Sequence, residues 1–591
     1  MTTSNFAVWA PRPERLALVI RPAGEPQRVL TPIKMQRDEE GWWRPDEQLP
    51  DFVEDDVRYG YLLDDATTPL PDPRSRRQPD GVHALSQSYD PSRYDWSDSQ
   101  WYGRQLAGGV IYELHVGTFT PAGTLTSTLD KLDHLVDLGV DFVELMPVNA
   151  FNGTHNWGYD GVSWFAVHEP YGGPLAYQQF VDACHQRGLA VIQDVVYNHL
   201  GPSGNYLPQY GPYLTETAAN PWGSSVNLDG EFSDEVRQYI LDSARMWLRD
   251  YHVDGLRLDA VHALHDTRAV HILEDLSIES GALSAALGKP LPLIAESDLN
   301  DPRLITSREA GGYGLTAQWS DDFHHALYVS LTGDKTGYYA DFDSVAAVAK
   351  VFEQGFFHTG TRSSFRGRTH GQPIDTLRTP TWRLVVCSDN HDQIGNRANG
   401  ERLSAKINRR QLALAATITL LSPFTPMIFM GEEWGALTPW QFFTSHPEPD
   451  LAAAVAEGRL AEFAAMEWDT AAVPDPQDPA TFEQSKLDWS ELETQPGQEL
   501  FEVQRQLLLI RRQHPDLTDP RFDHGSATSD QNEDWLLIER GQMIIVANFG
   551  AVPAKVELPF PIDSLLELGR ATLNEQQAEL GAHSALVGKR V

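Results

Sequence analysis

The sequence has few cysteines, which excludes a fold held together by disulfides. Cys184 and Cys387 are the only two among 591 residues, and each lies in an apolar stretch. Two cysteines cannot form a disulfide framework, so we expect both to be buried free thiols.

Long apolar runs are also missing. No uncharged apolar stretch approaches the roughly 20 residues that a transmembrane helix needs. Residues 1–7 have neither the basic start nor the apolar core of a signal peptide. We therefore expect a cytoplasmic protein with no membrane partner.

Basic residues are scarce relative to acidic ones. There are 46 Lys and Arg against 83 Asp and Glu, a formal net charge of −37. Such a charge repels nucleic acid and anionic membranes, so neither is an expected partner, and a neutral substrate fits better. The acidic residues are dispersed, which is typical of a solvated surface.

Several motifs of common enzyme classes are absent as well. The sequence shows no phosphate-binding glycine loop, no obvious serine or cysteine nucleophile and no closely spaced metal-ligating cysteines. We therefore expect no cofactor and no metal site, although the sequence leaves a structural cation open.

The pattern of apolar residues changes along the chain. Short strands separated by Pro and Gly signals predict an N-terminal immunoglobulin-like β-sandwich over residues 1–90, followed by a connector over 91–108. Short strands return after about residue 518, at 535–539 and 543–548, and predict a C-terminal β-sandwich over 516–591.

Between these parts, apolar runs alternate with helical patterns. Eight runs predict parallel strands, at 110–116, 140–146, 189–196, 253–258, 291–295, 315–319, 382–387 and 426–430. Apolar periodicity predicts a helix over 125–138, ended by Gly139. Eight such units indicate a central (β/α)8 TIM barrel over 109–515, with loop insertions at 198–234, 320–380 and 435–515.

The segment from Asp254 to His262 is the most informative of these strands. Residues two apart on a strand point the same way, so Arg257 and Asp259 share a face. The guanidinium would favour the ionised form of Asp259. Alone, this pattern is equally consistent with a structural ion pair.

Other polar residues fall at the ends of other predicted strands, where barrel enzymes keep their active sites. Asp194 and His199 follow the third strand, His262 the fourth, Glu296 the fifth, and His391 and Asp392 the seventh. Glycoside hydrolysis needs one carboxylic acid and one carboxylate across the scissile bond. Glu296 follows an apolar run that should raise its pKa and keep it protonated as the acid.

Four segments carry a family resemblance: Asp-Val-Val-Tyr-Asn-His (194–199), Gly-Leu-Arg-Leu-Asp-Ala-Val-His (255–262), Ile-Ala-Glu-Ser (294–297) and Asn-His-Asp (390–392). In this order they resemble the four regions of the α-amylase family of glycoside hydrolases. The resemblance implies that Asp259 is the nucleophile, Glu296 the acid and base, and Asp392 the residue that holds sugar hydroxyls. It also implies that Arg257, His199 and His391 orient these groups or bind the same sugar, and that Tyr159 stacks on it.

Within that family the chain resembles the trehalose-releasing branch nearly from end to end. The segments that carry this resemblance are 6–11, 78–83, 295–300, 319–327, 390–397, 430–434 and 441–446. It implies cleavage of the α-1,4 bond next to the terminal trehalose of maltooligosyl trehalose, in sequence with a maltooligosyl trehalose synthase. Tyr328 departs from the pattern, which has His there. A glycogen-branching or debranching enzyme, with the same three carboxylates, is the alternative.

Spacing alone does not indicate how trehalose is recognised. The candidate contacts after the sixth strand are Asp321, Asp322, His324 and His325, and the candidate loop aromatics are Trp222, Phe357 and Trp434. Core packing is the alternative for each aromatic residue. The basic stretch 362–371 is either a hydroxyl-binding loop or a salt-bridged surface turn.

Overall fold

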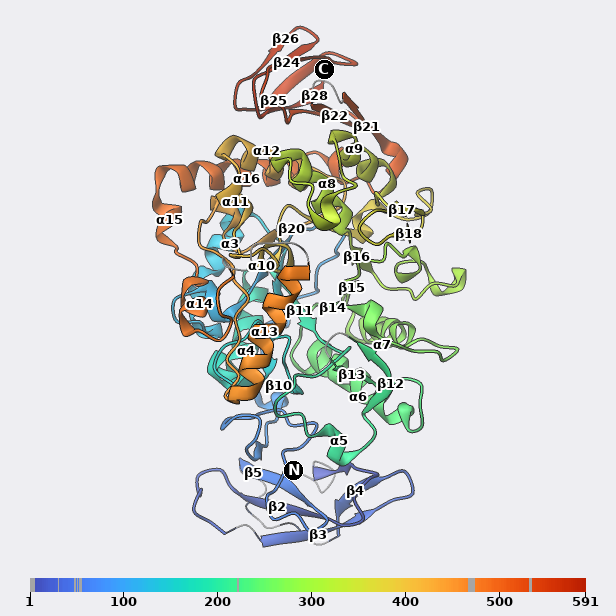
Figure 1. Ribbon diagram of the computed structural model, residues 1–591, viewed down its shortest axis with the longest axis vertical. Helices are drawn as coiled ribbons and strands as arrows, with labels where there is room; N and C mark the ends of the chain where they lie inside the picture. The colour runs from blue at the N-terminus through green and yellow to red at the C-terminus, as the bar shows by residue number, and fades with distance from the viewer. Residues whose placement is uncertain are drawn as a thin grey trace.

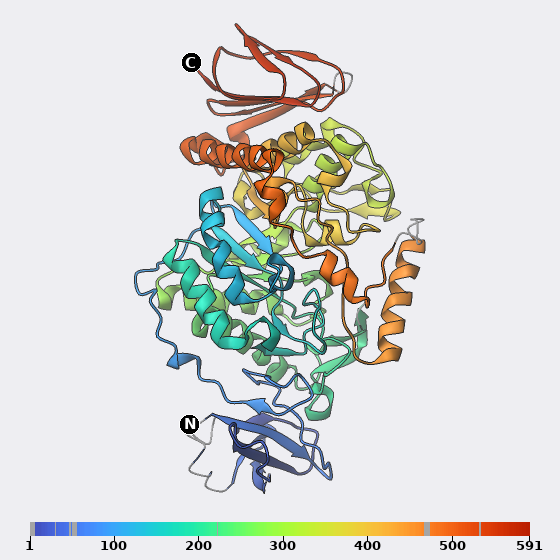
Figure 2. The same cartoon turned by 90° about the vertical axis from the view of Figure 1, so that its left-hand side faces the viewer.

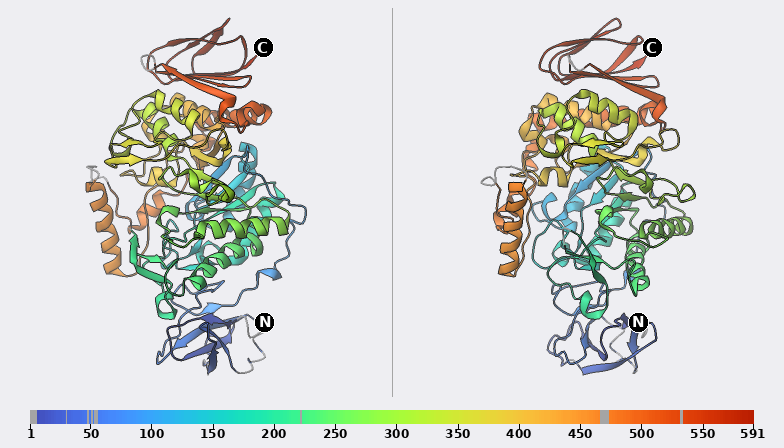
Figure 3. Two further views of the ribbon diagram at one scale, coloured as in Figure 1. Left: turned by 90° about the vertical axis from the view of Figure 1, so that its right-hand side faces the viewer. Right: turned by 45° about the vertical axis from the view of Figure 1, so that its right-hand side comes forward.

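The computed structural model describes residues 6–29, 31–46, 49, 52, 56–220, 223–465, 473–530 and 534–591. The chain forms a central barrel with one sheet domain at each end of the long axis, so that the two termini lie far apart (Figures 1 and 3). Within the described residues, no helix has the length and apolar character needed to cross a membrane.

The N-terminal domain is a six-stranded antiparallel sheet. Its strand order is β1-β4-β3-β2-β5-β6, with β1 at Val8–Trp9, β2 at Leu16–Pro22, β3 at Thr31–Arg37, β4 at Trp42–Pro45, β5 at Val57–Leu63 and β6 at Ser86–Gln87. Strand β3 pairs with β2 through its first half and with β4 through its second. Alternating residues, Leu16, Leu18 and Ile20, point into the buried face.

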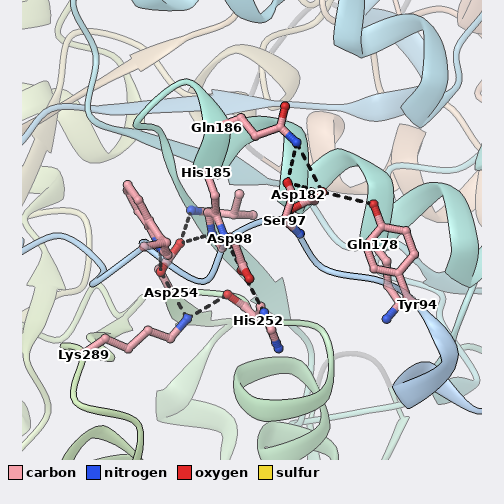
Figure 4. Close-up of polar contacts among 12 residues, drawn as sticks. Tyr94, Ser97, Asp98, Gln178, Asp182, His185, Gln186, His252, Asp254 and Lys289 are labelled. Carbon is pink, nitrogen blue, oxygen red and sulfur yellow. Dashed lines mark hydrogen bonds and ion pairs between the residues drawn. The ribbon is translucent and has the colours of Figure 1, made fainter.

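Side chains fix the connector to the end of the barrel at which the strands begin (Figure 4). The Ser97 backbone N–H and hydroxyl both donate to Asp182 on helix α4 (Gly173–Gln186), at 3.1 and 2.9 Å. Asp98 accepts hydrogen bonds from His185 and His252, at 2.9 and 2.8 Å. The N-terminal sheet is therefore joined to the barrel by an ordered segment.

All eight predicted barrel strands are present and close into one parallel barrel, so the predicted fold class is confirmed. The strands are β7 (Ile111–Leu114), β8 (Phe142–Leu145), β11 (Ala190–Val195), β14 (Gly255–Leu258), β15 (Leu293–Ala295), β16 (Ala317–Trp319), β19 (Leu384–Cys387) and β20 (Thr425–Phe429). Each β14 residue is buried, because helices cover the outer face of the barrel and side chains fill its interior.

Helices surround the barrel (Figure 1). Besides α4, they include α2 (Leu125–Thr128), α3 (Leu132–Leu138), α6 (Ser233–Arg245), α7 (Ile272–Leu287), α8 (Asp321–Thr332), α9 (Val345–Gln354), α12 (Arg409–Leu420) and α16 (Gln495–Gln513). Short helices are α1 (Val116–Phe119), α10 (His391–Gly395) and α11 (Leu403–Lys406). A π-helical turn, Met246–Asp250, continues α6.

The single helix predicted over 125–138 was wrong in one respect. The segment is divided into α2, a 3-10 turn at Leu129–Lys131 and α3. Thr124 and Ser127 form a capping box, and the Thr128 hydroxyl donates to the Thr124 carbonyl at 3.0 Å. Such hydroxyls compete with the helical backbone pattern, which explains the break. Gly139 ends α3 with a left-handed conformation, as predicted.

The three predicted insertions carry secondary structure of their own. Residues 198–234 contain α5 (Leu207–Tyr210) and the hairpin of β12 (Leu214–Asn220) and β13 (Gly223–Val226), and a second short hairpin, β9 (Asn149–Ala150) with β10 (Ser163–Val167), precedes them. Residues 320–380 contain α8, α9 and the hairpin of β17 (Thr361–Ser363) and β18 (Arg368–His370). Residues 435–515 contain α13 (Pro449–Ala465), α14 (Pro479–Gln484), α15 (Ser490–Glu493) and α16.

The C-terminal domain has two antiparallel sheets with an apolar core between them. The larger has the order β21-β22-β23-β28-β25, formed by Gly525–Asp530, Trp535–Arg540, Met543–Asn548, Ser584–Arg590 and Ile562–Leu568. The smaller has the order β24-β27-β26, formed by Ala554–Glu557, Gln577–Leu580 and Ala571–Asn574. Ile544 and Val546 of the first sheet pack with Val556 and Ala578 of the second.

Candidate active site

The carboxyl end of β14 carries an arginine that holds two carboxylates. The Arg257 Nη1 atom donates to Asp194 Oδ2 at 2.8 Å and to Asp259 Oδ1 at 2.7 Å. Arg257 is 2% exposed, and its guanidinium lies over the Trp319 ring at 4.4 Å. The buried guanidinium thus makes charge-assisted hydrogen bonds to both carboxyl groups. The pairing that the sequence predicted is thus part of a larger cluster.

Glu296 follows β15, which is hydrogen-bonded to β14, and faces the same cluster. Its Oε2 atom accepts a hydrogen bond from the Ala260 backbone N–H at 2.5 Å and lies 3.8 Å from Arg257 Nη2. Burial, and to a lesser degree Asp259, Asp321 and Asp392, raise the pKa of Glu296 well above its usual range, although Arg257 opposes this. The raised pKa was predicted from the apolar run before Glu296, and it suits a proton donor.

The backbone next to Asp259 is strained. Ala260 has φ 38° and ψ 53°, the left-handed conformation that residues other than glycine rarely adopt. This turn points the Ala260 N–H at Glu296. The strain therefore links the two candidate catalytic carboxyl groups.

Two residues after β11 support Asp259 from the other side. The Asn198 amide donates to Asp259 Oδ2 at 2.8 Å and to its carbonyl oxygen at 2.9 Å. His199 contacts Asn198 through Nδ1 and the Tyr159 carbonyl oxygen through Nε2, the latter at 2.9 Å. His199 therefore positions Asn198 and the Tyr159 backbone.

Tyr159 and His391 form the floor of the site near Asp194. The Tyr159 hydroxyl donates to Asp194 Oδ2 at 2.8 Å and lies 2.8 Å from His391 Nε2, and the two rings stack at 5.4 Å. Burial raises the pKa of Asp194 to about 6, with Arg257 acting in the opposite direction. Tyr159 thus connects Asp194 on β11 with His391, which follows β19.

Sequence reasoning missed Glu113, a buried residue of β7. Its two carboxylate oxygens accept hydrogen bonds from His391, one from Nδ1 at 2.5 Å and one from the backbone N–H at 3.0 Å. Burial lowers the pKa of His391, but the charge and hydrogen bond of Glu113 outweigh it and raise that pKa. The available signal was an acidic residue alone in an apolar strand, since such a group needs a partner inside the barrel.

Asp321, the first residue of α8, also faces the catalytic carboxyl groups. It follows Ala317 and Trp319, whose side chains fill the barrel interior, at the same two-residue spacing. Burial, together with the nearby Asp298 and Asp392, raises the pKa of Asp321 to about 8. No hydrogen bond to its side chain occurs among the described residues. Asp321 thus presents a carboxylic acid to the site.

Two of the predicted contacts after the sixth strand, Asp322 and His324, are hydrogen-bonded to other parts of the protein. Asp322 braces a loop, because its Oδ2 atom accepts from the backbone N–H groups of Phe357 and His358 and from the Asn300 amide. His324 is fully buried, with Nδ1 on the Ser388 carbonyl and Nε2 on the Tyr339 hydroxyl. Asp322 Oδ2 and both His324 ring nitrogens thus have protein partners, and sugar contact by either residue stays a prediction.

His325 and Phe357 lie nearby in an aromatic environment. His325 contacts the rings of Tyr338 and Tyr339, at 5.0 and 5.3 Å, and burial lowers the pKa of His325 well below its usual range. The half-buried Phe357 ring packs on Phe342 at 4.6 Å. Both remain candidates for contact with a sugar face.

The remaining predicted residues are spread out. His262 is exposed on the turn after Asp259. Trp434 is 1% exposed and packs on His134 and Trp489, so the prediction that it binds sugar is corrected in favour of core packing. Trp222 lies outside the described residues.

The basic stretch 362–371 forms the β17–β18 hairpin. Arg366 at its tip pairs with Asp298, which lies two residues beyond Glu296, and His370 Nε2 contacts the Asp298 carbonyl at 2.9 Å. Burial raises the pKa of Asp298, but the Arg366 charge outweighs it and the pKa is lowered. A salt bridge thus holds the hairpin in place, and this salt bridge lies beside Glu296, the candidate acid. In the described part of the chain, no group of three His, Cys, Asp or Glu residues is arranged to hold a metal ion.

Comparison with known proteins is consistent with this geometry. Residues 85–213 match the model of the alpha-amylase catalytic domain, and residues 520–587 match a domain of unknown function, DUF3459. The malto-oligosyltrehalose trehalohydrolase of Rhizobium sp. (strain M-11) is 57% identical over 99% of this chain and 97% of its own length. That of Arthrobacter ramosus is 61% identical over 86% of this chain and 87% of its own.

Solved structures agree on the fold. A putative alpha amylase from Salmonella typhimurium superposes with a TM-score of 0.86 at 34% identity, covering 98% of this chain and 97% of that one. A pullulanase from Anoxybacillus sp. LM18-11 has a TM-score of 0.73 at 18% identity, over 99% of this chain and 86% of that one, and shares the fold. The chain therefore belongs to the malto-oligosyltrehalose trehalohydrolases, a group of α-amylase-family glycoside hydrolases.

Proposed function

We propose that this enzyme is a retaining glycoside hydrolase that cleaves the α-1,4 bond next to the terminal trehalose of maltooligosyl trehalose. The observation that carries the mechanism is the position of Arg257, whose guanidinium contacts both Asp259 and Glu296. Two carboxyl groups on one guanidinium are close together, and retaining enzymes need a spacing of about 5 to 5.5 Å. Membership in the trehalohydrolase group supports the substrate.

In the first step, a carboxylate oxygen of Asp259 attacks the anomeric carbon of the glucose next to trehalose. The bond from that carbon to the bridging oxygen breaks as Glu296 transfers its proton to the oxygen, and trehalose leaves. The glucan chain is now esterified to Asp259. Burial raises the pKa of Glu296 and so favours its protonated form for this step, while hydrogen bonds from Arg257 and Asn198 hold the Asp259 side chain in position.

In the second step, Glu296 acts as a base. It removes a proton from water, the water oxygen attacks the anomeric carbon, and the bond to Asp259 breaks to release the glucan chain and restore the carboxylate. Glu296 ends this step protonated again. The cycle consumes one water and no cofactor.

The other groups bind sugar on either side of the bond. We assign Asp392, His391 and Tyr159 to the glucose that is attacked, because they lie with Asp194 on the β11 and β19 side of the site. The leaving trehalose must lie beside the acid, so Asp321 and the Asp298–Arg366 pair are its proposed contacts. Hydroxyl groups of a disaccharide supply donors and acceptors that match these side chains.

We also propose a cytoplasmic location and a maltooligosyl trehalose synthase that supplies the substrate. Both described cysteines, Cys184 and Cys387, are free and buried, which supports a reducing compartment. The substrate carries trehalose already linked to a glucan, so another enzyme has to form that linkage first.

Product analysis tests the proposal. Incubation with maltotriosyl trehalose should yield free trehalose and maltotriose, and NMR during the first turnovers should show the new reducing end in the α configuration. New α-1,6 branches in amylose without trehalose release would instead favour a branching enzyme, of which one relative is 29% identical over 54% of this chain. Initial release of the β anomer would contradict retention.

A further inference from the structure

We propose that Arg459 on the outlying helix α13 is a positioning residue that fixes the carboxylate of Asp392 through Asn396. The proposal rests on the role given to Asp392 above, namely holding sugar hydroxyls in the transition state. Figure 2 shows α13 standing at the edge of the molecule, away from the barrel strands. It belongs to the insertion at 435–515, which the catalytic steps do not otherwise use.

The contacts form a continuous chain. The Arg459 Nη1 atom donates to Asn396 Oδ1 at 3.1 Å, and its Nη2 atom donates to the Gly395 carbonyl at 2.5 Å. The Asn396 Nδ2 atom in turn donates to Asp392 Oδ1 at 2.8 Å. Within the described residues, Asn396 is the only side chain that donates a hydrogen bond to this carboxylate. The orientation of Asp392 therefore depends on the orientation of one amide.

The side-chain amide of an asparagine can rotate by about 180°, which exchanges its oxygen and its nitrogen. In this site the two orientations are not equivalent. Arginine offers only donors, so the amide oxygen has to face Arg459. The amide nitrogen then has to face Asp392, where it donates to an anion. Without Arg459 the amide oxygen loses this hydrogen bond, so the amide and the carboxylate that it contacts are less firmly oriented.

The surroundings hold Arg459 in place. Its guanidinium lies over the Phe442 ring at 5.0 Å and over the Phe463 ring at 4.6 Å. Gly395, which accepts the second hydrogen bond, packs so closely on Trp157 that an added Cβ atom would come within 1.9 Å of the ring. Trp157 also contacts His391 edge-on at 5.9 Å. Arg459 thus meets a rigid part of the site on one side and two aromatic rings on the other.

This arrangement has a kinetic consequence. If Asp392 binds the sugar hydroxyls more strongly in the distorted transition state, a misplaced carboxylate lowers kcat more than it raises KM. A helix with a merely structural role would change neither parameter in the folded enzyme. The insertion therefore contributes to turnover without touching substrate.

A double-mutant cycle tests the proposal. Arg459→Met keeps an unbranched side chain between the two rings and removes the hydrogen bonds, and Asn396→Ala removes the amide. We expect each to lower kcat by about tenfold with KM within about twofold, the size of one well-oriented hydrogen bond. The double variant should lose no more than Asn396→Ala alone, because Arg459 acts through Asn396. Arg459→Lys should recover part of the loss.

Controls separate this inference from the proposed function. Arg505→Met removes an exposed arginine whose only salt bridge within the described residues is with Glu502 on the same helix, and it should leave kcat unchanged. Asp392→Asn should lose most activity, and if it does not, the role given to Asp392 fails. If Asp392→Asn is inactive while Arg459→Met keeps full kcat, or if the two single losses multiply, the positioning role is wrong. Should Arg459→Met fail to fold, Arg459→Lys with Asn396→Ala completes the same cycle.

Discussion

Strand β14 has an aspartate at each end, and the surroundings of the two ends differ in their charge balance. The end at Asp254, where the strand begins, is called the lower end, and the end at Asp259 the upper end. Asp254 precedes the strand, is fully buried and has a partner for every oxygen (Figure 4). Its Oδ1 atom accepts from Trp101 Nε1 at 2.7 Å and lies 3.3 Å from Lys289 Nζ. Its Oδ2 atom accepts from His185 at 2.9 Å and from the Val191 N–H at 2.9 Å.

At the other end, the acidic groups outnumber the cations that pair with them. Asp194, Asp259 and Glu296 share the single guanidinium of Arg257. Burial raises the pKa of Glu296, and nearby acids add to it, whereas hydrogen bonds lower the pKa of Asp254 despite its burial. At the lower end the ionised form of Asp254 is thus favoured, whereas at the upper end burial and neighbouring acids favour the protonated form of Glu296. The proposed catalytic carboxyl groups lie at the upper end, and perturbed pKa values are typical of such sites.

The largest expected effect is on catalysis at the upper end. Glu296→Gln removes the proton that the leaving trehalose needs, so trehalose release should fall by about 100- to 10,000-fold. The fold should be intact, because the amide still accepts from the Ala260 N–H through its oxygen. Initial rates of trehalose release and circular dichroism measure the two properties.

The matched control is Glu279→Gln, which alters a partly exposed glutamate paired with Arg245 on α6. Its rate should equal that of the wild type. If the Glu296→Gln enzyme keeps near wild-type turnover, Glu296 is not the acid. The functional difference proposed between the two ends of the barrel would then be wrong as well.

The next largest effect is on stability at the lower end. Asp254→Ala leaves His185 and Lys289 without their buried carboxylate, and breaking such a pair costs about 3 to 5 kcal/mol. The midpoint of the barrel transition in urea should fall accordingly. The turnover of the remaining folded enzyme should be unchanged, because the catalytic groups are at the other end of the strand. A large loss of kcat in folded Asp254→Ala would show that the ends are coupled.

The lower cluster also predicts a dependence of stability on pH. Burial raises the pKa of Asp98, but hydrogen bonds from His185 and His252 outweigh it and lower that pKa, and the pKa of Asp254 is lowered likewise. These contributions are complete above the unfolded aspartate pKa of about 3.9 and are lost as pH falls through the folded value. Hydrogen bonds to Asp254 and Asp98 outweigh burial and raise the pKa of His185.

The contribution of His185 therefore has the opposite sign. It is complete below the unfolded histidine pKa of about 6.5 and is lost as pH rises through the raised folded value. The difference in urea midpoint between the wild type and His185→Gln should be largest between about pH 4 and 6.5 and should shrink at alkaline pH. A difference that grows toward alkaline pH would mean that His185 is neutral in the folded protein.

Sequence reasoning succeeded where one strand determines the outcome. The eight apolar runs predicted all eight barrel strands, because a buried parallel strand needs a continuous apolar run. The raised pKa of Glu296 followed from the same local run. The helix over 125–138 was wrong because hydroxyl groups at Thr124 and Thr128 take backbone hydrogen bonds, which apolar periodicity does not register.

It failed where distant segments decide which atoms have partners. Asp321 and Asp322 are adjacent and chemically identical, yet a loop 35 residues away occupies Asp322 and leaves Asp321 facing the site. Trp434 was indistinguishable from a sugar-binding aromatic until Trp489 and His134 were placed against it. Glu113 acts on His391, which is 278 residues away in the sequence, so its own strand does not show which side chain it contacts.

The smallest expected effect is the change in the free energy of unfolding that Glu296→Gln causes. The pKa of Glu296 is raised on folding, by burial and then by the neighbouring acids, so its contribution to stability is complete below the unfolded glutamate pKa of about 4.3 and is lost as pH rises through the folded value. Glu296→Gln cannot ionise and should gain stability relative to the wild type as pH rises from 4.5 to 8, on the order of 1 kcal/mol. Urea melts of both proteins at several pH values measure this difference. A wild type that is more stable than Glu296→Gln at pH 8 would mean that the ionised carboxylate is favoured by its surroundings, as Asp254 is at the other end of the barrel.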